Sequence, residues 1–399
     1  MLVRTGWITF AIILSFYMGG VAKAEEGQAC KVIDWPQWSS FKEYFVQADG
    51  RVLDDSSQRK ISSSEGQSYA MFFALLANDK STFDRLWRWS VANLAKGDIR
   101  SGLPAWIWGR HDDGTWGVLD ENAASDADLW FVYSLLEAGR VWDMPAYIHD
   151  AMVLLAQIEA KEIASPPGLG RMLLPAPEGF VQSDVWRFNP SYMPLPLLRR
   201  MAQVSPQGQW DAIAEHTVHL IQRSSPLGYV ADWVAYDLGK NGEGHFGPDP
   251  VKGSVGSYDA IRTYMWAGMT DPTDPLAKPL MQAIGGLAKA TARSGTPPEK
   301  VDVDSGVVSG VGPFGFSAAL LPYLKASGQS ALLKSQFGRV QFAWYASMAP
   351  ESVARQQPPY YDYVLSMFGT AWLDGRYQFQ RTGQIQLEWE KSCSHAVTR

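Results

Sequence analysis

The chain has 399 residues, of which 46% are hydrophobic and 19% are charged, with 36 Gly and 24 Pro. This composition excludes collagen-like, coiled-coil and disordered proteins and supplies enough apolar material for one large core. The formal net charge of −6 argues against a nucleic-acid partner, because such proteins usually need a basic face.

The first 24 residues have the three-part pattern of a secretory signal peptide. Arg4 gives a positive start, residues 7–18 form an apolar run, and Ala22 and Ala24 form a small-residue cleavage site. The apolar run is shorter than the roughly 20 residues that a membrane span needs, and a membrane anchor is the alternative. We expect residues 1–24 to direct export to the periplasm and residues 25–399 to form a single catalytic domain.

The two cysteines, Cys30 and Cys393, lie near opposite ends of the exported chain. An oxidising compartment permits a disulfide, and the termini of a domain often lie close together. Two unpaired thiols are the alternative, because sequence alone does not fix the separation of the two Cα atoms. We expect catalysis to be independent of either outcome.

Helical periodicity dominates the remaining chain, and the predicted helices come in consecutive pairs. The pairs cover residues 67–77 with 82–94, 126–139 with 145–158, 190–202 with 210–222, 258–268 with 275–292, and 316–325 with 330–344. A last helix at 361–374 has an available partner at 38–46, near the other end of the chain. Six such hairpins can close into a ring. The sequence therefore predicts an all-α (α/α)6 toroid with short strands and loops over its active-site end; an irregular helical bundle is the alternative.

Two predicted helix starts have the spacing of a capping box, in which a serine caps the helix and an acid follows three residues later. Ser62 and Glu65 have this spacing, so capping is the structural alternative for Glu65. Ser125 and Asp128 have it too, which leaves Asp126 without a structural role.

A third acid, Asp259, begins another predicted helix, where an ion pair with Arg262 one turn later is the structural alternative. If alternate helices of the ring run the same way, Glu65, Asp126 and Asp259 converge at one end. Burial and neighbouring carboxylates raise the pKa of such an acid, whereas a helix N-terminus lowers it. One acid can then hold a proton while another acts as a base. Glycoside hydrolysis requires such a pair of carboxyl groups.

Aromatic residues recur near the same helix starts, in a chain that contains 17 Trp and 16 Tyr. Each residue alone is better explained by core packing, but the recurrence favours a groove that stacks on sugar rings. The residues are Trp106, Trp108, Trp130, Trp186, Tyr192, Tyr258, Tyr360, Tyr361 and Tyr363.

Three motifs together resemble glycoside hydrolase family 8: residues 64–69 (SEGQSY), 124–128 (ASDAD) and 257–262 (SYDAIR). The likeness extends over nearly the whole exported chain and is greatest to periplasmic endoglucanases encoded with bacterial cellulose synthase. It implies a six-hairpin barrel and inverting hydrolysis of β-1,4-glucan without a metal or organic cofactor. We expect a monomer that binds a β-1,4-glucan chain, with the cellulose synthase complex as a further partner.

The resemblance also assigns roles to the three acids. Glu65 matches the general acid, Asp259 the general base, and Asp126 the carboxylate that binds and orients the sugar at the cleavage point. Ala70 and Ala127 stand where the family often has glycine, a departure that should not alter the chemistry.

The resemblance implies further contacts around these acids. Tyr258 and Arg262 are expected to shape the site of the attacking water, with Arg262 beside Asp259. Trp108, Tyr192 and Tyr363 are expected to contact sugar.

Two other function classes use some of the same residues. A polysaccharide lyase on a toroidal fold would use a tyrosine and an arginine, and Tyr258 and Arg262 are the candidates for these two residues. A non-catalytic glucan-binding subunit would use the aromatic residues but would not need the acids. His216 and His219 can share a helix face, but they lack a third metal ligand, so no metal site is expected.

Overall fold

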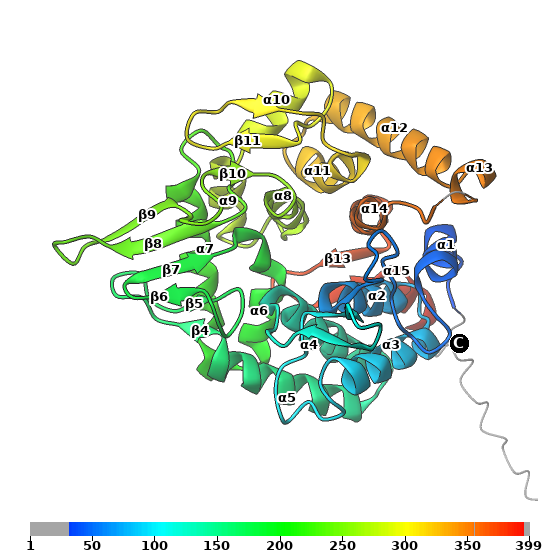
Figure 1. Ribbon diagram of the computed structural model, residues 1–399. Coiled ribbons are helices and arrows are strands. Elements are labelled where there is room, and N and C mark those ends of the chain that lie inside the picture. Colours follow the sequence, from blue (N-terminus) through cyan, green and yellow to red (C-terminus); the bar gives the residue numbers. More distant parts are fainter. Residues whose placement is uncertain (1–31, 355, 395–399) are drawn as a thin grey trace, which may run out of the picture.

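The computed structural model describes residues 32–354 and 356–394, and its helices form two concentric rings (Figure 1). The inner ring consists of α2 (Ser64–Leu76), α4 (Ser125–Val141), α6 (Leu195–Val204), α8 (Ala260–Met269), α11 (Phe314–Ala326) and α14 (Tyr360–Leu373). The outer ring consists of α3 (Lys80–Asn93), α5 (Pro145–Lys161), α7 (Trp210–Ser224), α9 (Ala277–Ala283) with α10 (Gly286–Ser294), α12 (Ser330–Ser347) and α1 (Pro36–Phe45). The predicted (α/α)6 toroid is therefore confirmed.

The first and last helices of the inner ring, α2 and α14, meet to close the ring. Phe368 of α14 packs against Phe72 and Phe73 of α2, with ring centroids 5.5 and 4.7 Å apart. Helix α1 completes the sixth hairpin by packing Phe45 against Tyr360 at the start of α14. The predicted signal segment and Cys30 lie outside the described residues, as does the side chain of Cys393, so export and the disulfide stay predictions.

Aromatic side chains fill the centre of the inner ring. Phe72, Trp130, Trp266 and Phe368 come from four different inner helices and are all buried. Trp130 lies 4.8 Å from Phe72, 5.4 Å from Trp266 and 5.2 Å from Phe368, measured between ring centroids. We call these four side chains the aromatic plug, because they fill the centre of the inner ring with a packed core.

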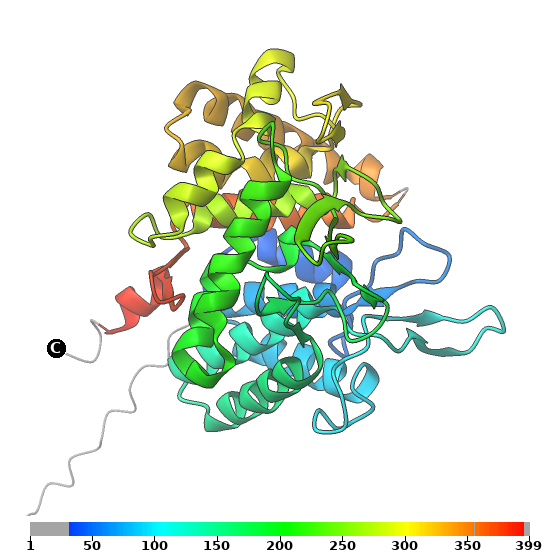
Figure 2. The same ribbon diagram turned by 90° about the vertical axis from the view of Figure 1, so that its left-hand side faces the viewer.

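Short antiparallel strands cover the two ends of the ring differently. At the end where the inner helices begin lie β1 (Ser62–Ser63), β2 (Ile107–Arg110), β3 (Trp116–Asp120), β6 (Val181–Gln182), β7 (Val185–Phe188), β8 (Val234–Leu238), β9 (Gly244–Pro248), β10 (Val255–Gly256), β11 (Lys300–Asp302) and β12 (Val308–Ser309). The opposite end is closed by β13 (Tyr377–Phe379), β14 (Ile385–Leu387) and α15 (Glu388–Ser394), as Figure 2 shows. The strands β4 (Ile163–Ala164) and β5 (Met172–Leu173) and helix α13 (Pro350–Val353) complete the connections. Among the described residues, no helix combines the length and apolar character that crossing a membrane requires.

Two predicted helices differ from the structure. The helix predicted at 275–292 is broken between α9 and α10, where the Gly286 N–H donates to the carbonyl of Gly228 at 2.8 Å. The helix predicted at 190–202 begins only at Leu195, because Pro194 precedes it and a short 3-10 turn occupies Pro190–Tyr192. Both errors reflect glycine or proline within an otherwise periodic pattern.

The crossing of α11 and α14 predicts a position where an added methyl group is costly. A Cβ on Gly369 would lie 2.2 Å from the carbonyl oxygen of Ala318, so the helices must separate. We expect Gly369→Ala to lower the free energy of unfolding by about 1–3 kcal/mol, measured by urea denaturation. Gly338→Ala on α12 is the matched control: no atom lies within 4 Å of its Cβ, so a gain of up to about 1 kcal/mol is expected. Equal free energies of unfolding for the two variants would contradict a close crossing of α11 and α14 at Gly369.

Candidate active site

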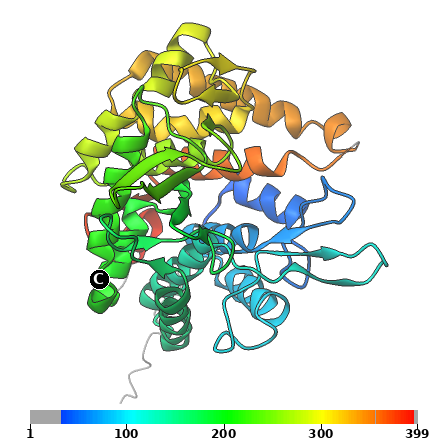
Figure 3. The same ribbon diagram turned by 60° about the vertical axis from the view of Figure 1, so that its left-hand side comes forward.

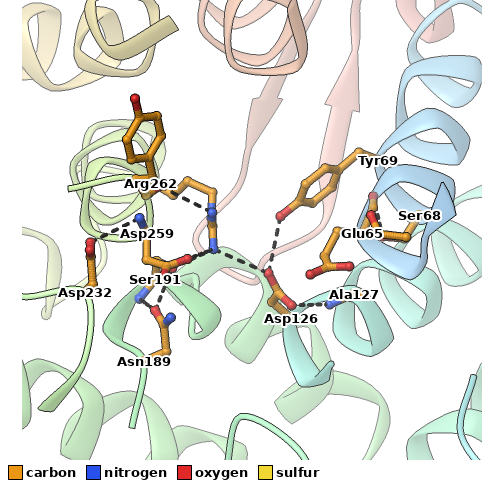
Figure 4. A network of polar contacts seen from close by, with 12 residues as sticks. Glu65, Ser68, Tyr69, Asp126, Ala127, Asn189, Ser191, Asp232, Asp259 and Arg262 are labelled. Atoms are coloured by element: carbon orange, nitrogen blue, oxygen red, sulfur yellow. Dashed lines mark hydrogen bonds and ion pairs between the residues drawn. The ribbon is translucent and has the colours of Figure 1, made fainter. Parts of the chain in front are cut away.

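The structure brings the three predicted acids to the same end of the inner ring. Glu65 and Asp126 are the second residues of α2 and α4, and Asp259 immediately precedes α8. Figure 4 shows Asp126 next to Glu65 on one side and Arg262 between Asp126 and Asp259. The shared direction of the inner helices therefore produces the convergence that their sequence positions predict.

Arg262 is the buried cation at the centre of this group. Its Nη2 lies 3.1 Å from Oδ1 of Asp259 and 3.7 Å from Oδ2 of Asp126. It also donates to Ser191 Oγ from Nη2 and to Tyr361 Oη from Nη1, both at 3.0 Å. A buried guanidinium is tolerated only with such compensation, so Arg262 and its partners fix one another's positions.

Asp126 is almost completely buried and has few partners. Its Oδ1 accepts a hydrogen bond from the Ala127 N–H at 2.9 Å, and its Oδ2 accepts one from Tyr69 Oη at 3.4 Å. Burial and the neighbouring charge of Glu65 raise the pKa of Asp126 to about 8, although Arg262 opposes this rise. Burial and the charge of Glu65 therefore favour the protonated form of Asp126.

Glu65 is not engaged in capping its own helix. Ser63, not Ser62, caps α2 by accepting the Gly66 N–H at 3.0 Å, so the predicted Ser62–Glu65 capping box is wrong. Burial raises the pKa of Glu65, while its own backbone N–H, the charge of Arg262 and the hydroxyl groups of Ser63 and Ser64 oppose this rise. The carboxyl group is thus available as a proton donor.

The predicted capping box at α4 is wrong as well. The hydroxyl of Ser125 makes no hydrogen bond, and Asp128 is fully buried against Glu162. Burial raises the pKa of both carboxyl groups well above the usual value, and the neighbouring carboxyl groups Asp126, for Asp128, and Asp128, for Glu162, add to the rise. Within the same residues, no cluster of three or more His, Cys, Asp or Glu is suited to hold a metal ion.

Asp232, which the sequence analysis missed, caps the helix that carries Asp259. Its Oδ1 accepts the backbone N–H groups of Ser257, Asp259 and Ala260 at 2.7, 3.1 and 2.7 Å. Burial and the charge of Asp259 raise the pKa of Asp232 to about 6. The side chain comes from the segment before β8, more than twenty positions away, so no local motif indicates it.

Of the predicted sugar contacts, Tyr192 lies beside Arg262, whereas Trp108 packs against Trp89 of the outer helix α3. The guanidinium carbon of Arg262 lies 5.8 Å from the centroid of the Tyr192 ring, and burial and then the charges of Asp126, Asp259 and Glu65 raise the pKa of Tyr192 well above its usual value. Trp108 lies on β2, paired with the segment that enters α2. Tyr258 is exposed at the rim, and its hydroxyl donates to Glu299 at 3.3 Å rather than to an acid of the site.

Tyr363 does not reach the site, which corrects its prediction as a sugar contact. Its ring is fully buried against Trp344 and Phe45 on the outer side of α14. Tyr361 faces the acids instead: its hydroxyl donates to the Tyr258 carbonyl at 2.5 Å and accepts from Arg262. Two residues along a helix are separated by about 200°, so only one of the pair can face inward.

Comparison with known proteins agrees with this geometry. The model of the glycosyl hydrolases family 8 matches residues 24–375. An endoglucanase of Pseudomonas fluorescens (strain SBW25) is 47% identical over 96% of this chain and 97% of its own length. An endoglucanase of Escherichia coli (strain K12) is 38% identical over 98% and 99% of the two chains. The crystal structure of an endo-1,4-D-glucanase from Vibrio fischeri ES114 superposes with a TM-score of 0.79 at 39% identity, covering 89% of this chain and 99% of that one.

The three hydrogen bonds to Asp232 predict that it holds the start of α8. We expect Asp232→Ala to lower stability by about 0.5–2 kcal/mol and to speed amide exchange of Asp259 and Ala260, as the loss of a cap does. Asp232→Asn keeps the accepting oxygen and should restore most of the protection. Hydrogen-exchange mass spectrometry of residues 257–262 measures both effects.

Asp79→Ala is the matched control, because Asp79 caps α3 through the Thr82 N–H at 3.1 Å. It should destabilise the protein without changing exchange at residues 257–262. Equal protection of that segment in Asp232→Ala and the native chain would show that the cap is dispensable.

Proposed function

The chain belongs to glycosyl hydrolase family 8 and is a glycoside hydrolase of the endoglucanase type; from this premise we propose that it cleaves β-1,4-glucan with inversion, using Glu65 as acid and Asp259 as base. The observation that carries the proposal is the meeting of three carboxyl groups from three inner helices around Arg262. Membership of this hydrolase family favours the hydrolase over a polysaccharide lyase or a non-catalytic glucan-binding subunit.

Glu65 donates the proton that the leaving group needs. Because burial raises its pKa and Asp126 lies beside it, the pair retains a proton that Glu65 transfers to the glycosidic oxygen. The bond between that oxygen and the anomeric carbon then breaks. In an inverting reaction, a water molecule attacks this carbon from the opposite face.

Asp259 receives the proton of the attacking water. Its carboxylate is held by Arg262 but stays about a third exposed (29%), so water can reach it. Asp232 fixes the backbone from which Asp259 projects, so Asp232 is a positioning residue. Arg262 and Tyr361, which are hydrogen-bonded to each other, lie beside the site of the attacking water.

Asp126 binds the sugar at the cleavage point. It is buried beside Arg262 and Tyr69, a place from which a carboxyl group can hydrogen-bond sugar hydroxyls without acting as the base. Tyr192, whose ring centroid lies 5.8 Å from the guanidinium carbon of Arg262, supplies a further hydroxyl and an aromatic face. Both groups thus contribute to binding that strengthens in the transition state.

The cellular role proposed is the trimming of cellulose in the periplasm, beside the cellulose synthase complex. The signal-like pattern of residues 1–24 and the resemblance to endoglucanases encoded with that synthase support it. Fractionation of cells that express the full chain tests the location: we expect a shortened form in the periplasmic fraction. A chain of full length in the membrane fraction would instead indicate the anchor.

Removing the proton of Glu65 tests the acid role. We expect Glu65→Gln to lower hydrolysis of carboxymethylcellulose by about 10²–10⁴-fold, measured by reducing sugar, while oligosaccharide binding stays largely intact. Glu215→Gln on the exposed face of α7 is the control and should leave turnover unchanged. Native turnover by Glu65→Gln would remove Glu65 from the acid role, and a β-anomeric first product by NMR would exclude inversion.

The shared proton of Glu65 and Asp126 predicts a change in pH dependence. With Asp126→Asn, no neighbouring carboxylate opposes ionisation of Glu65, so the pKa of Glu65 falls and the required proton is lost at lower pH. We expect the alkaline limb of the kcat/KM profile to move to lower pH, together with a lower kcat from weaker sugar binding. An alkaline limb that stays in place while kcat falls would show that the two carboxyl groups titrate independently.

A further inference from the structure

One part of the outer wall combines exposed cations with exposed aromatic rings and has no part in the mechanism above. We propose that it docks on a membrane surface rich in anionic phospholipids. The residues are Lys289 and Arg293 of α10 and Lys334, Phe342 and Tyr345 of α12, and we call them the basic-aromatic face. The inference goes beyond the proposed hydrolysis and does not depend on the roles given to the acids.

The charge of this wall is opposite to that of the whole chain. The chain has 41 acidic and 35 basic residues and a formal net charge of −6. Yet residues 275–298, which include α9 and α10, contain no Asp or Glu, and neither do residues 305–350, which include α11 and α12. Within the part of the chain that the structure describes, none of Lys289, Arg293 and Lys334 forms a salt bridge. The wall therefore attracts anions in spite of the negative net charge.

The aromatic rings of the face are open to solvent. Phe342 and Tyr345 are 78% and 73% exposed, more than any other large hydrophobic residue of the described chain. Both share one side of α12 with Lys334, because Tyr345 lies three turns and about 20° further round the helix and Phe342 lies about 80° round it. Aromatic rings at the level of the lipid headgroups, with cations beside them, are typical of protein surfaces that contact a bilayer.

A contact between α10 and α12 makes the face continuous. Gln336 of α12 donates from Nε2 to the carbonyl of Gly295, directly after α10, at 3.0 Å. Arg293 at the end of α10 therefore lies near the half of α12 that carries Lys334, and Lys289 lies one turn before Arg293. Both helices lie on the outer wall of the ring in Figure 1, and Figure 3 shows this wall at the upper edge of the molecule.

The extent of the face identifies the occupant. Tyr345 borders a groove of about 390 Å³ between α1 and α12, but Phe342 and the three cations lie outside it. A peptide seated in that groove would leave most of the face uncovered. A second copy that used the same face would bring the cations of both copies together. A bilayer is an extended surface, so lipid phosphates can pair with the cations while the rings enter the interface.

Docking through this wall leaves the proposed site open. Helix α12 is the second helix of its hairpin, so it returns toward the end of the ring where the inner helices begin. Phe342 and Tyr345 lie in the half of α12 that is nearer to this end. The bilayer would therefore lie beside the three acids and would not cover them.

The test measures co-sedimentation of the protein with lipid vesicles. Residues 25–399 are used, because they include every described residue and exclude the apolar run at 7–18. We expect binding to vesicles of phosphatidylglycerol and phosphatidylcholine in equal parts, and little binding to phosphatidylcholine alone. High salt should release the protein, because it screens exposed charges.

Two double variants separate the cations from the rings. Arg293→Glu with Lys334→Glu should lower the vesicle affinity by at least about 25-fold, because each cation near an anionic surface contributes about fivefold. Phe342→Ser with Tyr345→Ser should lower it by about tenfold through the loss of apolar contact. Hydrolysis of carboxymethylcellulose by both variants should equal that of the native chain, which shows that they are folded.

Arg223→Glu with Lys240→Glu is the matched control, because these exposed cations lie on α7 and in the β8–β9 turn, outside the face. It should lower vesicle affinity far less than the Arg293 and Lys334 pair does. Equal loss in the two pairs would overturn the docking surface, as would failure of the native chain to bind anionic vesicles. Self-association without vesicles that the Phe342 and Tyr345 pair abolishes would assign the face to a second copy instead. Absent hydrolysis by a native chain that binds vesicles would count against the proposed function alone.

Discussion

The buried guanidinium of Arg262 is the interaction on which the site depends. Removing a charge from water is costly unless opposite charges and hydrogen-bond acceptors surround it. Asp126, Asp259, Ser191 and Tyr361 supply them from α4, the start of α8, the turn before α6 and the start of α14. One side chain therefore couples four segments of the ring, and the separation of the carboxyl groups is set by the same contacts that stabilise the fold.

The acids are available for chemistry because other groups cap their helices. Ser63 satisfies the N-terminus of α2, and Asp232 satisfies that of α8. The same arrangement recurs at α11, where Asp362 of the neighbouring α14 accepts the Gly315 N–H at 2.8 Å. A helix start needs hydrogen-bond acceptors whatever their origin. When another residue provides them, an acid in the first turn can face the other acids of the site.

The aromatic plug connects the stability of the ring with the geometry of the site. Tyr69 packs edge-on against Trp130 and Phe368 of the plug, while its hydroxyl donates to Asp126. Trp266 donates from its indole N–H to the carbonyl of Ser191, whose hydroxyl accepts from Arg262. The side chains around Asp126 and Arg262 are thus attached to a packed core, which fixes their orientation.

The sequence by itself determined the paired helices and the acids at their starts, because hydrophobic periodicity and turn residues act over a few neighbouring positions. From these, the ring and the convergence of Glu65, Asp126 and Asp259 followed. Only the tertiary structure decided that Ser63 caps α2, that Asp232 caps α8 and that Tyr361 rather than Tyr363 faces Arg262. These choices depend on which distant segments touch and on the rotation of each helix about its axis, and neither leaves a pattern in the local sequence.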